Sequence, residues 1–371
     1  MTNLPEKIRV LLDKVVKEMR TRENIESVGL FGSWSRGEAT EASDVDILLI
    51  NNTSLIYEFV ERIELKGFLV DLDYLPKIQL QKGTPPILDQ KIYEVQILYD
   101  KQGSLTDRNQ WMTQHYRSME RVELRTQKQV VDSDVHLSRA TSALARKDFP
   151  SAYLFATMAW DSIMRILMEI TLEPFSPSRF IQKIQRSATK LEKQNLIPVY
   201  LKVTGLDEIE HTDVTAKINL FTEIWHSLKE NIVEKKKVLE SAHFKEKTKI
   251  NYYLTPAFLE GIVTRTKSIL HSGELIEAAH YLNRVFIDMI KSYVWIKSVL
   301  PGVEIDPTTL IKSLKRLEHK TPKNYTDVLQ LLNLHPLDKS VATNTIEKAK
   351  DTLIKTRKQR KTLIRNHLIK S

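Results

Sequence analysis

The chain has 371 residues, enough for about two or three domains, and carries 56 Lys and Arg against 47 Asp and Glu, a formal net charge of +9. It has no cysteine, which excludes disulfides and thiolate metal sites. No run of about 18 apolar residues occurs, and the charged N-terminal segment lacks the apolar stretch of a signal peptide. We therefore expect a cytoplasmic protein that does not enter a membrane.

Residues 1–104 carry the alternating helix and strand patterns of an α/β domain. Apolar residues recur at helical spacing near the start, and short β-branched runs follow. The expected elements, in chain order, are a helix over 8–19, strands over 28–31 and 44–50, a helix over 53–65, a strand over 68–75, a loop over 82–86 and a strand over 95–99.

From about residue 105 the strand patterns fade and helical patterns dominate. The whole chain has only 10 glycines and 13 prolines, and such a scarcity of helix breakers favours long helices. The segment 151–170 is apolar almost all round, which predicts a helix buried inside a bundle. A helix or two helices are expected over 109–147, a loop over 173–178 and a further helix over 179–193.

The second helical half repeats the plan of the first. Segment 277–296 resembles 151–170, and 303–317 resembles 173–187 with Pro307 and Pro177 in register. We interpret this similarity as a duplication, with chance resemblance as the alternative. The expected fold class is therefore α+β, an N-terminal mixed-sheet domain (1–104) followed by two all-α helical bundles (105–245 and 246–371), joined by an exposed connection near Lys235–Lys249.

A glycine and a serine directly after the first expected strand form a candidate phosphate site. Gly32 permits a sharp turn and lets an anion approach backbone N–H groups, and the Ser33 hydroxyl adds a donor. Arg36, in the same loop, can pair with a phosphate through its planar guanidinium group. The loop is not a Walker A motif, because the Gly-Lys-Ser ending is missing. We expect a nucleoside triphosphate to bind over these three residues.

Four aspartates on two expected strands form the second part of the candidate site. One residue separates Asp44 from Asp46, and one separates Asp71 from Asp73, so each pair points to a single face of its strand. If the two strands are neighbours, the first pair and one of the later pair make a carboxylate cluster suited to two Mg²⁺ ions. The pattern alone leaves open whether Asp71 or Asp73 is the third carboxylate.

The Gly-Ser pair, the loop RGEATEASD and the Asp-x-Asp pair resemble the signature of the polymerase-β-like nucleotidyltransferase superfamily, especially its minimal and aminoglycoside-modifying members. The resemblance covers roughly residues 25–100. It favours Asp71 over Asp73, because the family places its third acid between apolar residues. It implies phosphate contacts and metal ligands at Gly32, Ser33, Asp44, Asp46 and Asp71.

The resemblance implies a magnesium-dependent enzyme that moves a nucleoside monophosphate from a nucleoside triphosphate, ATP by default, to an acceptor hydroxyl and releases pyrophosphate. The acceptor stays open between a small molecule, a protein and an RNA, as in toxin–antitoxin systems, and the positive net charge favours the latter two. A nucleotide-binding regulatory module without turnover is the alternative outside the enzymes. The bundles are candidates for homo-oligomer or protein contacts.

Weaker features have structural explanations beside functional ones. Asp161 or Glu169, on the apolar helix, could activate the acceptor or be paired structurally. Trp34 could contact a nucleotide or anchor its loop. The basic segment 348–371 could bind RNA phosphates or form the solvated face of a bundle helix. No arginine and histidine pair has the spacing of the helical nuclease toxins, so no ribonuclease activity is expected.

Overall fold

The computed structural model describes residues 4–53, 57–80, 84–233, 239–240, 242–299, 305–318, 322–335 and 337–370. The chain divides into two compact units, which we name unit 1 (Met1–Ser118 with His243–Arg265) and unit 2 (Met119–Ala242 with Thr266–Ser371). These units differ from the three expected domains, because residues 105–118 and 243–265 belong with the sheet and the remaining helices form one unit. The expected connection at Lys235–Lys249 lies partly outside the described residues.

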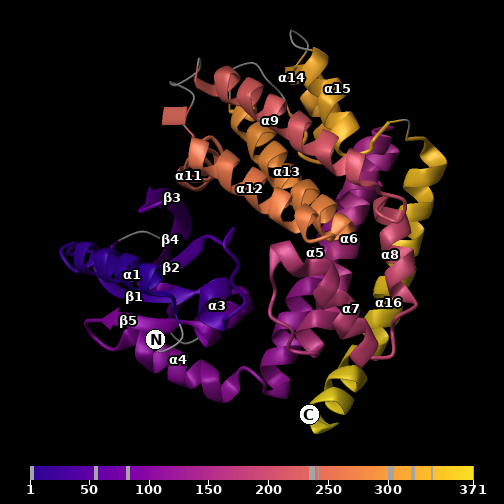
Figure 1. Ribbon diagram of the computed structural model, residues 1–371. Helices are drawn as coiled ribbons and strands as arrows, with labels where there is room; N and C mark the ends of the chain where they lie inside the picture. The colour runs from indigo at the N-terminus through magenta and orange to yellow at the C-terminus, as the bar shows by residue number, and fades with distance from the viewer. Residues whose placement is uncertain are drawn as a thin grey trace. The chain divides into compact units, whose positions relative to one another are not determined.

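Unit 1 is built on a five-stranded mixed sheet with the strand order β3-β4-β2-β1-β5 (Figure 1). The pair β2 and β4 is parallel, and the other neighbouring strands are antiparallel. The four expected strands are confirmed, and the strand expected over 95–99 is β5. Their bounds are β1 Ile25–Phe31, β2 Val45–Asn51, β3 Phe59–Leu65, β4 Phe68–Pro76 and β5 Gln96–Asp100.

The helix expected over 53–65 is wrong, because its described C-terminal part is strand β3. Lys66 and Gly67 both have positive φ, 54° and 77°, which makes a tight hairpin turn between β3 and β4. Phe59 and Ile63 on one face pack against the core, while Arg62 points to the other face and is buried. The period-two pattern of FVERIEL was the signal for a strand.

One face of the sheet is covered by α1 (Glu6–Met19), as its apolar spacing predicts. Ile8, Leu11 and Val15 are fully or almost fully buried there. On β2 the side chains of Val45 and Ile47 join this core, so the residues between them point to the opposite face. The remaining elements of unit 1 are α2 Gly32–Arg36, η1 Lys77–Leu80, η2 Pro86–Leu88, α3 Asp89–Glu94, α4 Ser104–His115, α11 Phe244–Tyr253 and the first part of α12 Pro256–His271.

Unit 2 is all-helical, and its long apolar helix is buried as expected. The pattern over 109–147 forms two helices, α4 in unit 1 and α5 in unit 2. None of the helices in the described part of the chain combines the length and the apolar character needed to cross a membrane. The elements are α5 Met119–Ala145, α6 Phe149–Ile170, η3 Pro177–Arg179, α7 Phe180–Lys190, α8 Leu196–Thr204, α9 His211–Val233, the end of α12, α13 Leu275–Ser298, α14 Leu310–Leu317, α15 Pro322–Leu331 and α16 Lys339–Lys370.

The two helical halves of unit 2 exchange helix caps. Glu277, in the first turn of α13, accepts hydrogen bonds of 3.1 Å each from the backbone N–H groups of Ile181 and Gln182 at the start of α7. Ser151 and Asp148, at the start of α6, accept bonds of 2.7 and 3.1 Å from the first N–H groups of α14. The first turns of α13 and α6 therefore accept hydrogen bonds from the free backbone N–H groups at the starts of α7 and α14, which have no acceptor within their own helix. These contacts join the two halves, and the predicted duplication stays a prediction.

Candidate active site

The aspartates of β2 and β4 lie side by side on the face of the sheet that α1 does not cover. The parallel register pairs Asp46 with Asp71, and Asp44 immediately precedes β2 on the same face. On the far side of β4, Arg62 of β3 pairs with Asp71. A row of Asp46, Asp71 and Arg62 therefore crosses three neighbouring strands, and the structure brings together the three acids that the resemblance favours.

Gly32 lies directly against the Asp46 carboxylate. Its φ is +76°, a backbone conformation that costs residues with a side chain. A Cβ atom at this position would stand 2.0 Å from Asp46 Oδ2 and 2.8 Å from its Cγ. Glycine is therefore required twice, once for the turn after β1 and once for the close approach of the loop to the acid.

The loop carries a buried hydroxyl that is unused within the described part of the chain. Ser33 Oγ has no hydrogen-bond partner there, although it is shielded from solvent. Such an orphaned donor is unusual in a folded protein and suits an oxygen of a bound molecule. Trp34, next to it, packs against the core of unit 1, which favours its interpretation as a loop anchor.

Arg36 is held inside its own loop by two carboxylates. Its Nη1 atom lies 2.7 Å from Glu94 Oε1, and its Nε atom lies 3.0 Å from Glu38 Oε2. The same Glu94 oxygen accepts a 2.9 Å hydrogen bond from the backbone N–H of Gly32. Glu94, at the end of α3, thus fixes the start and the end of α2, and sequence reasoning missed it because the contact joins distant positions. The phosphate role expected for Arg36 stays a prediction.

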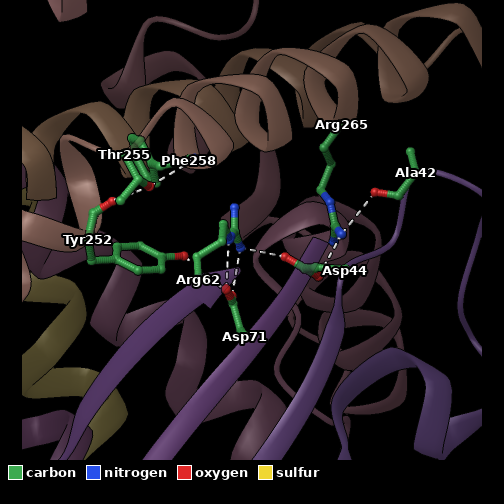
Figure 2. Close-up of polar contacts among 8 residues, drawn as sticks. All are labelled: Ala42, Asp44, Arg62, Asp71, Tyr252, Thr255, Phe258 and Arg265. Atoms are coloured by element: carbon green, nitrogen blue, oxygen red, sulfur yellow. Dashed lines mark hydrogen bonds and ion pairs between the residues drawn. The ribbon is translucent and has the colours of Figure 1, made fainter. Parts of the chain in front are cut away.

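Two guanidinium groups lie on the acids (Figure 2). Arg62 donates from Nε and Nη2 to the two oxygens of Asp71, both at 2.6 Å, and from Nη2 to Asp44 Oδ2 at 2.7 Å. Arg265 of α12 donates from Nη2 to Asp44 Oδ1 at 2.7 Å and to the carbonyl oxygen of Ala42 at 3.0 Å. Neither arginine was identified from sequence, because Arg62 fell in an expected helix and Arg265 lies far along the chain.

Asp73 belongs to a different group of charges. Its carboxylate contacts the ammonium group of Lys91, which also contacts Glu58. Burial raises the pKa of Asp73 to about 7, and Lys91 opposes that rise only in part. The structure therefore places Asp71, and not Asp73, opposite Asp46.

Burial and charge act in opposite directions on the three clustered acids. Burial would raise the pKa of Asp44, but Arg265 and Arg62 outweigh it and hold that pKa below its ordinary value. Burial raises the pKa of Asp46 well above its ordinary value, and the carboxylates of Asp44 and Asp71 raise it further. The two arginines thus leave negative charge at Asp46 poorly compensated, and an added cation would stabilise its ionised form.

The carboxylate oxygens are of the kind that magnesium takes, although arginines contact two of the three acids. Among the described residues, no group of three or more acidic or histidine side chains is arranged to hold a metal ion as it stands. Asp44, Asp46 and Asp71 nevertheless supply the carboxylate oxygens that Mg²⁺ prefers, and the guanidinium groups show that this face gathers positive charge. The chemistry of the donor set is therefore compatible with a magnesium centre once a guanidinium group moves.

The candidate acids of unit 2 are engaged within the bundle. Asp161 pairs with Arg284 at 2.7 Å and accepts a 2.6 Å hydrogen bond from the Tyr200 hydroxyl. Glu169 pairs with Arg125 at 2.8 Å. The basic C-terminal segment forms much of α16, which packs against α5 and α6 with Ala349 and Ile364 buried. These contacts favour the structural interpretations.

Comparisons with known proteins find similarity in the part of the chain that contains these residues. A family profile described as "Nucleotidyltransferase domain" matches residues 12–98, which include Gly32, Ser33 and all four aspartates. Protein adenylyltransferase MntA of Thermococcus cleftensis is 38% identical over 81 residues, which are 21% of this chain and 82% of that protein.

Two Methanocaldococcus jannaschii proteins, each named as a proposed protein adenylyltransferase, are also similar to this chain. MJ1379 is 39% identical over 72 residues, 18% of this chain and 72% of its own length. MJ0126 is 37% identical over 65 residues, 18% of this chain and 64% of its own length, so the chain spans less than two thirds of that relative.

The crystal structure of a nucleotidyltransferase-like protein from Exiguobacterium sibiricum aligns over 87% of this chain and 90% of its own, with a TM-score of 0.33 and 11% identity. The similarity to MntA covers most of that protein. The family profile spans the Gly-Ser loop and the acidic face of the sheet, which we define as Asp44, Asp46 and Asp71. The chain therefore belongs to the nucleotidyltransferase family.

Proposed function

We propose that the protein is a magnesium-dependent nucleotidyltransferase that moves AMP from ATP to a hydroxyl group of a protein acceptor and releases pyrophosphate. The observation that carries this proposal is the placement of three carboxylates beside the Gly32 turn and beside the Ser33 hydroxyl, which has no partner among the described residues. The choice of ATP and of a protein acceptor rests on the relatives, among which MntA bears the name protein adenylyltransferase.

Each residue has a role that follows from its position. Ser33 binds the phosphates through its buried hydroxyl, and Gly32 lets the loop backbone approach them closely. Asp44, Asp46 and Asp71 would hold two Mg²⁺ ions through their carboxylate oxygens. Magnesium bound there would neutralise charge on the triphosphate and on the leaving pyrophosphate. Glu94 keeps the loop in place through Gly32 N.

The reaction is a displacement at the α-phosphorus. The acceptor hydroxyl oxygen forms a bond to that phosphorus, and the bond from phosphorus to the bridging oxygen breaks. Pyrophosphate leaves with the electron pair, and the hydroxyl proton passes to a carboxylate oxygen of Asp71. Without a metal, burial raises the pKa of Asp71 above its ordinary value, and Arg62 offsets this rise only in part.

The test is transfer of label from α-labelled ATP, GTP, CTP and UTP, with magnesium, into a cell extract separated into protein, RNA and small-molecule fractions. We expect label from ATP in protein. Asp46→Asn should reduce transfer about a thousandfold, equivalent to about 4 kcal/mol of transition-state stabilisation, without unfolding unit 1.

Asp73→Asn is the matched control, because it removes an acid from the same face of the same sheet outside the proposed metal site, and it should keep measurable transfer. Label in RNA or in small molecules would replace the protein acceptor by that class. Nucleotide binding with no label in any fraction would favour a regulatory module, and undiminished transfer by Asp46→Asn would refute the two-metal assignment.

A further inference from the structure

The segment His243–Arg265 is part of unit 1 although it is far from the sheet in sequence. It contributes α11, which packs against β3 through Phe244 and Phe59, whose rings lie 5.6 Å apart. It also contributes the start of α12, where Thr255 caps the helix by accepting a 3.2 Å hydrogen bond from Phe258 N. Figure 2 shows this segment beside the acids of the sheet.

The segment fits tightly around Arg62. A Cβ atom on Gly261 of α12 would stand 2.7 Å from Arg62 Nη1 and 2.8 Å from Leu69 Cδ1, so a side chain there would push the ends of both side chains away. The Arg62 guanidinium lies 5.2 Å from the centre of the Tyr252 ring, and the Tyr252 hydroxyl lies 3.4 Å from Asp71 Oδ2. The segment is therefore built to hold positive charge over the acids.

Both oxygens of Asp44 are engaged by arginines. Arg265 takes Oδ1 and Arg62 takes Oδ2, each at 2.7 Å. A divalent cation that shared Asp44 would meet two positive charges at contact distance, so it cannot enter beside both of them without strong repulsion. One guanidinium group must leave Asp44 when the metal binds.

Arg265 is the group that can leave at lower cost. Arg62 is 4% exposed and makes a bidentate contact with Asp71, a geometry that is stronger than a single bond. Arg265 is 15% exposed and reaches Asp44 with one nitrogen atom, which also donates to the carbonyl oxygen of Ala42. Release of Arg265 frees one oxygen of Asp44 and leaves the Arg62 contacts with Asp71 in place.

We infer that Arg265 is a positioning residue that sets the metal affinity of the acidic face. Arg265 contacts Asp44 in the absence of metal and withdraws when a divalent cation binds. Its guanidinium group then lies close enough to attract the anionic phosphates of the nucleotide. The inference rests on the proposed function only in taking Asp44 as a metal ligand. It assigns residues outside the matched range 12–98 to the site.

The experiment is titration of the full-length protein with Mg²⁺ by calorimetry, and with Mn²⁺ by electron spin resonance, without nucleotide or acceptor. Arg265→Gln should bind either metal at least tenfold more tightly than the wild type. Arg265→Lys keeps the charge and should stay near the wild-type affinity. Lys267→Gln removes an exposed charge from the same helix and should change nothing. Arg265→Met, which keeps the apolar stem, replaces the glutamine variant if that variant does not fold.

A merely structural role for Arg265 predicts the opposite sign, because a disordered acidic face binds metal more weakly. Equal or weaker binding by Arg265→Gln therefore overturns the inference, and so does the absence of metal binding from every variant. Binding that also persists in the double variant Asp44→Asn with Arg265→Gln would place the metal elsewhere and overturn it as well. Because no transfer is measured, failure of the nucleotidyltransferase proposal through its acceptor or its nucleotide would leave this result unchanged.

Discussion

Replacing Gly32 by alanine would put a methyl group where the Asp46 carboxylate lies. The added Cβ would stand 2.0 Å from Asp46 Oδ2, and ordinary van der Waals contact begins at 3.4 Å, so the oxygen would have to move by about 1.4 Å. A displacement of about 1 Å at a reacting centre can cost about a hundredfold in rate. The positive φ of +76° adds strain of about 1–3 kcal/mol to the folded state.

Gly37→Ala separates these two effects. Gly37 ends the same loop with a φ of +70°, and no atom lies within 4 Å of the Cβ that alanine would add. It should therefore share the loss of stability, about 1–3 kcal/mol, without displacing any acid. Gly32→Ala should lose the same stability and, in addition, about a hundredfold or more of the transfer rate.

The assay measures transfer from α-labelled ATP and unfolding in urea for the wild type and both variants. Transfer by Gly32→Ala within about threefold of that by Gly37→Ala would refute the argument that the loop positions Asp46 by contact. Equal and large losses in both variants would assign the effect to backbone strain in the loop.

Two further predictions concern unit 2. Burial, with Lys291 and Arg284 nearby, lowers the pKa of His136 from 6.5 to about 4, so below pH 6.5 the unfolded chain binds more protons than the folded one. The free energy of unfolding should therefore fall by up to about 3 kcal/mol as the pH drops from about 6.5 to about 4. In urea unfolding, the stability of His136→Gln should depend less on pH over this range. Arg284→Gln removes the arginine that pairs with the buried Asp161 carboxylate and should destabilise unit 2 by about 2 kcal/mol. Adding Asp161→Asn should partly reverse this loss of stability. Additive losses in the double variant would contradict the pairing.

The sequence by itself determined the local features of the site. Because neighbouring side chains alternate along a strand, Asp44 and Asp46 had to share a face once DVDILLI formed a strand. The turn at Gly32 followed from the residue's conformational freedom. The amphipathic spacing of α1 predicted the face that it buries, whereas the repeat of the helical halves stays a prediction.

The tertiary structure alone decided which distant residues meet. The parallel register of β2 and β4 put Asp71 opposite Asp46 and left Asp73 to Lys91, a choice that the pattern FLVDLDYL cannot make because both acids share one face. Hairpin pairing with β4 made residues 59–65, expected to be helical, into β3 and brought Arg62 to the acids. Arg265 joins them across a long stretch of sequence, since such contacts depend on packing between elements and leave no local periodicity to read.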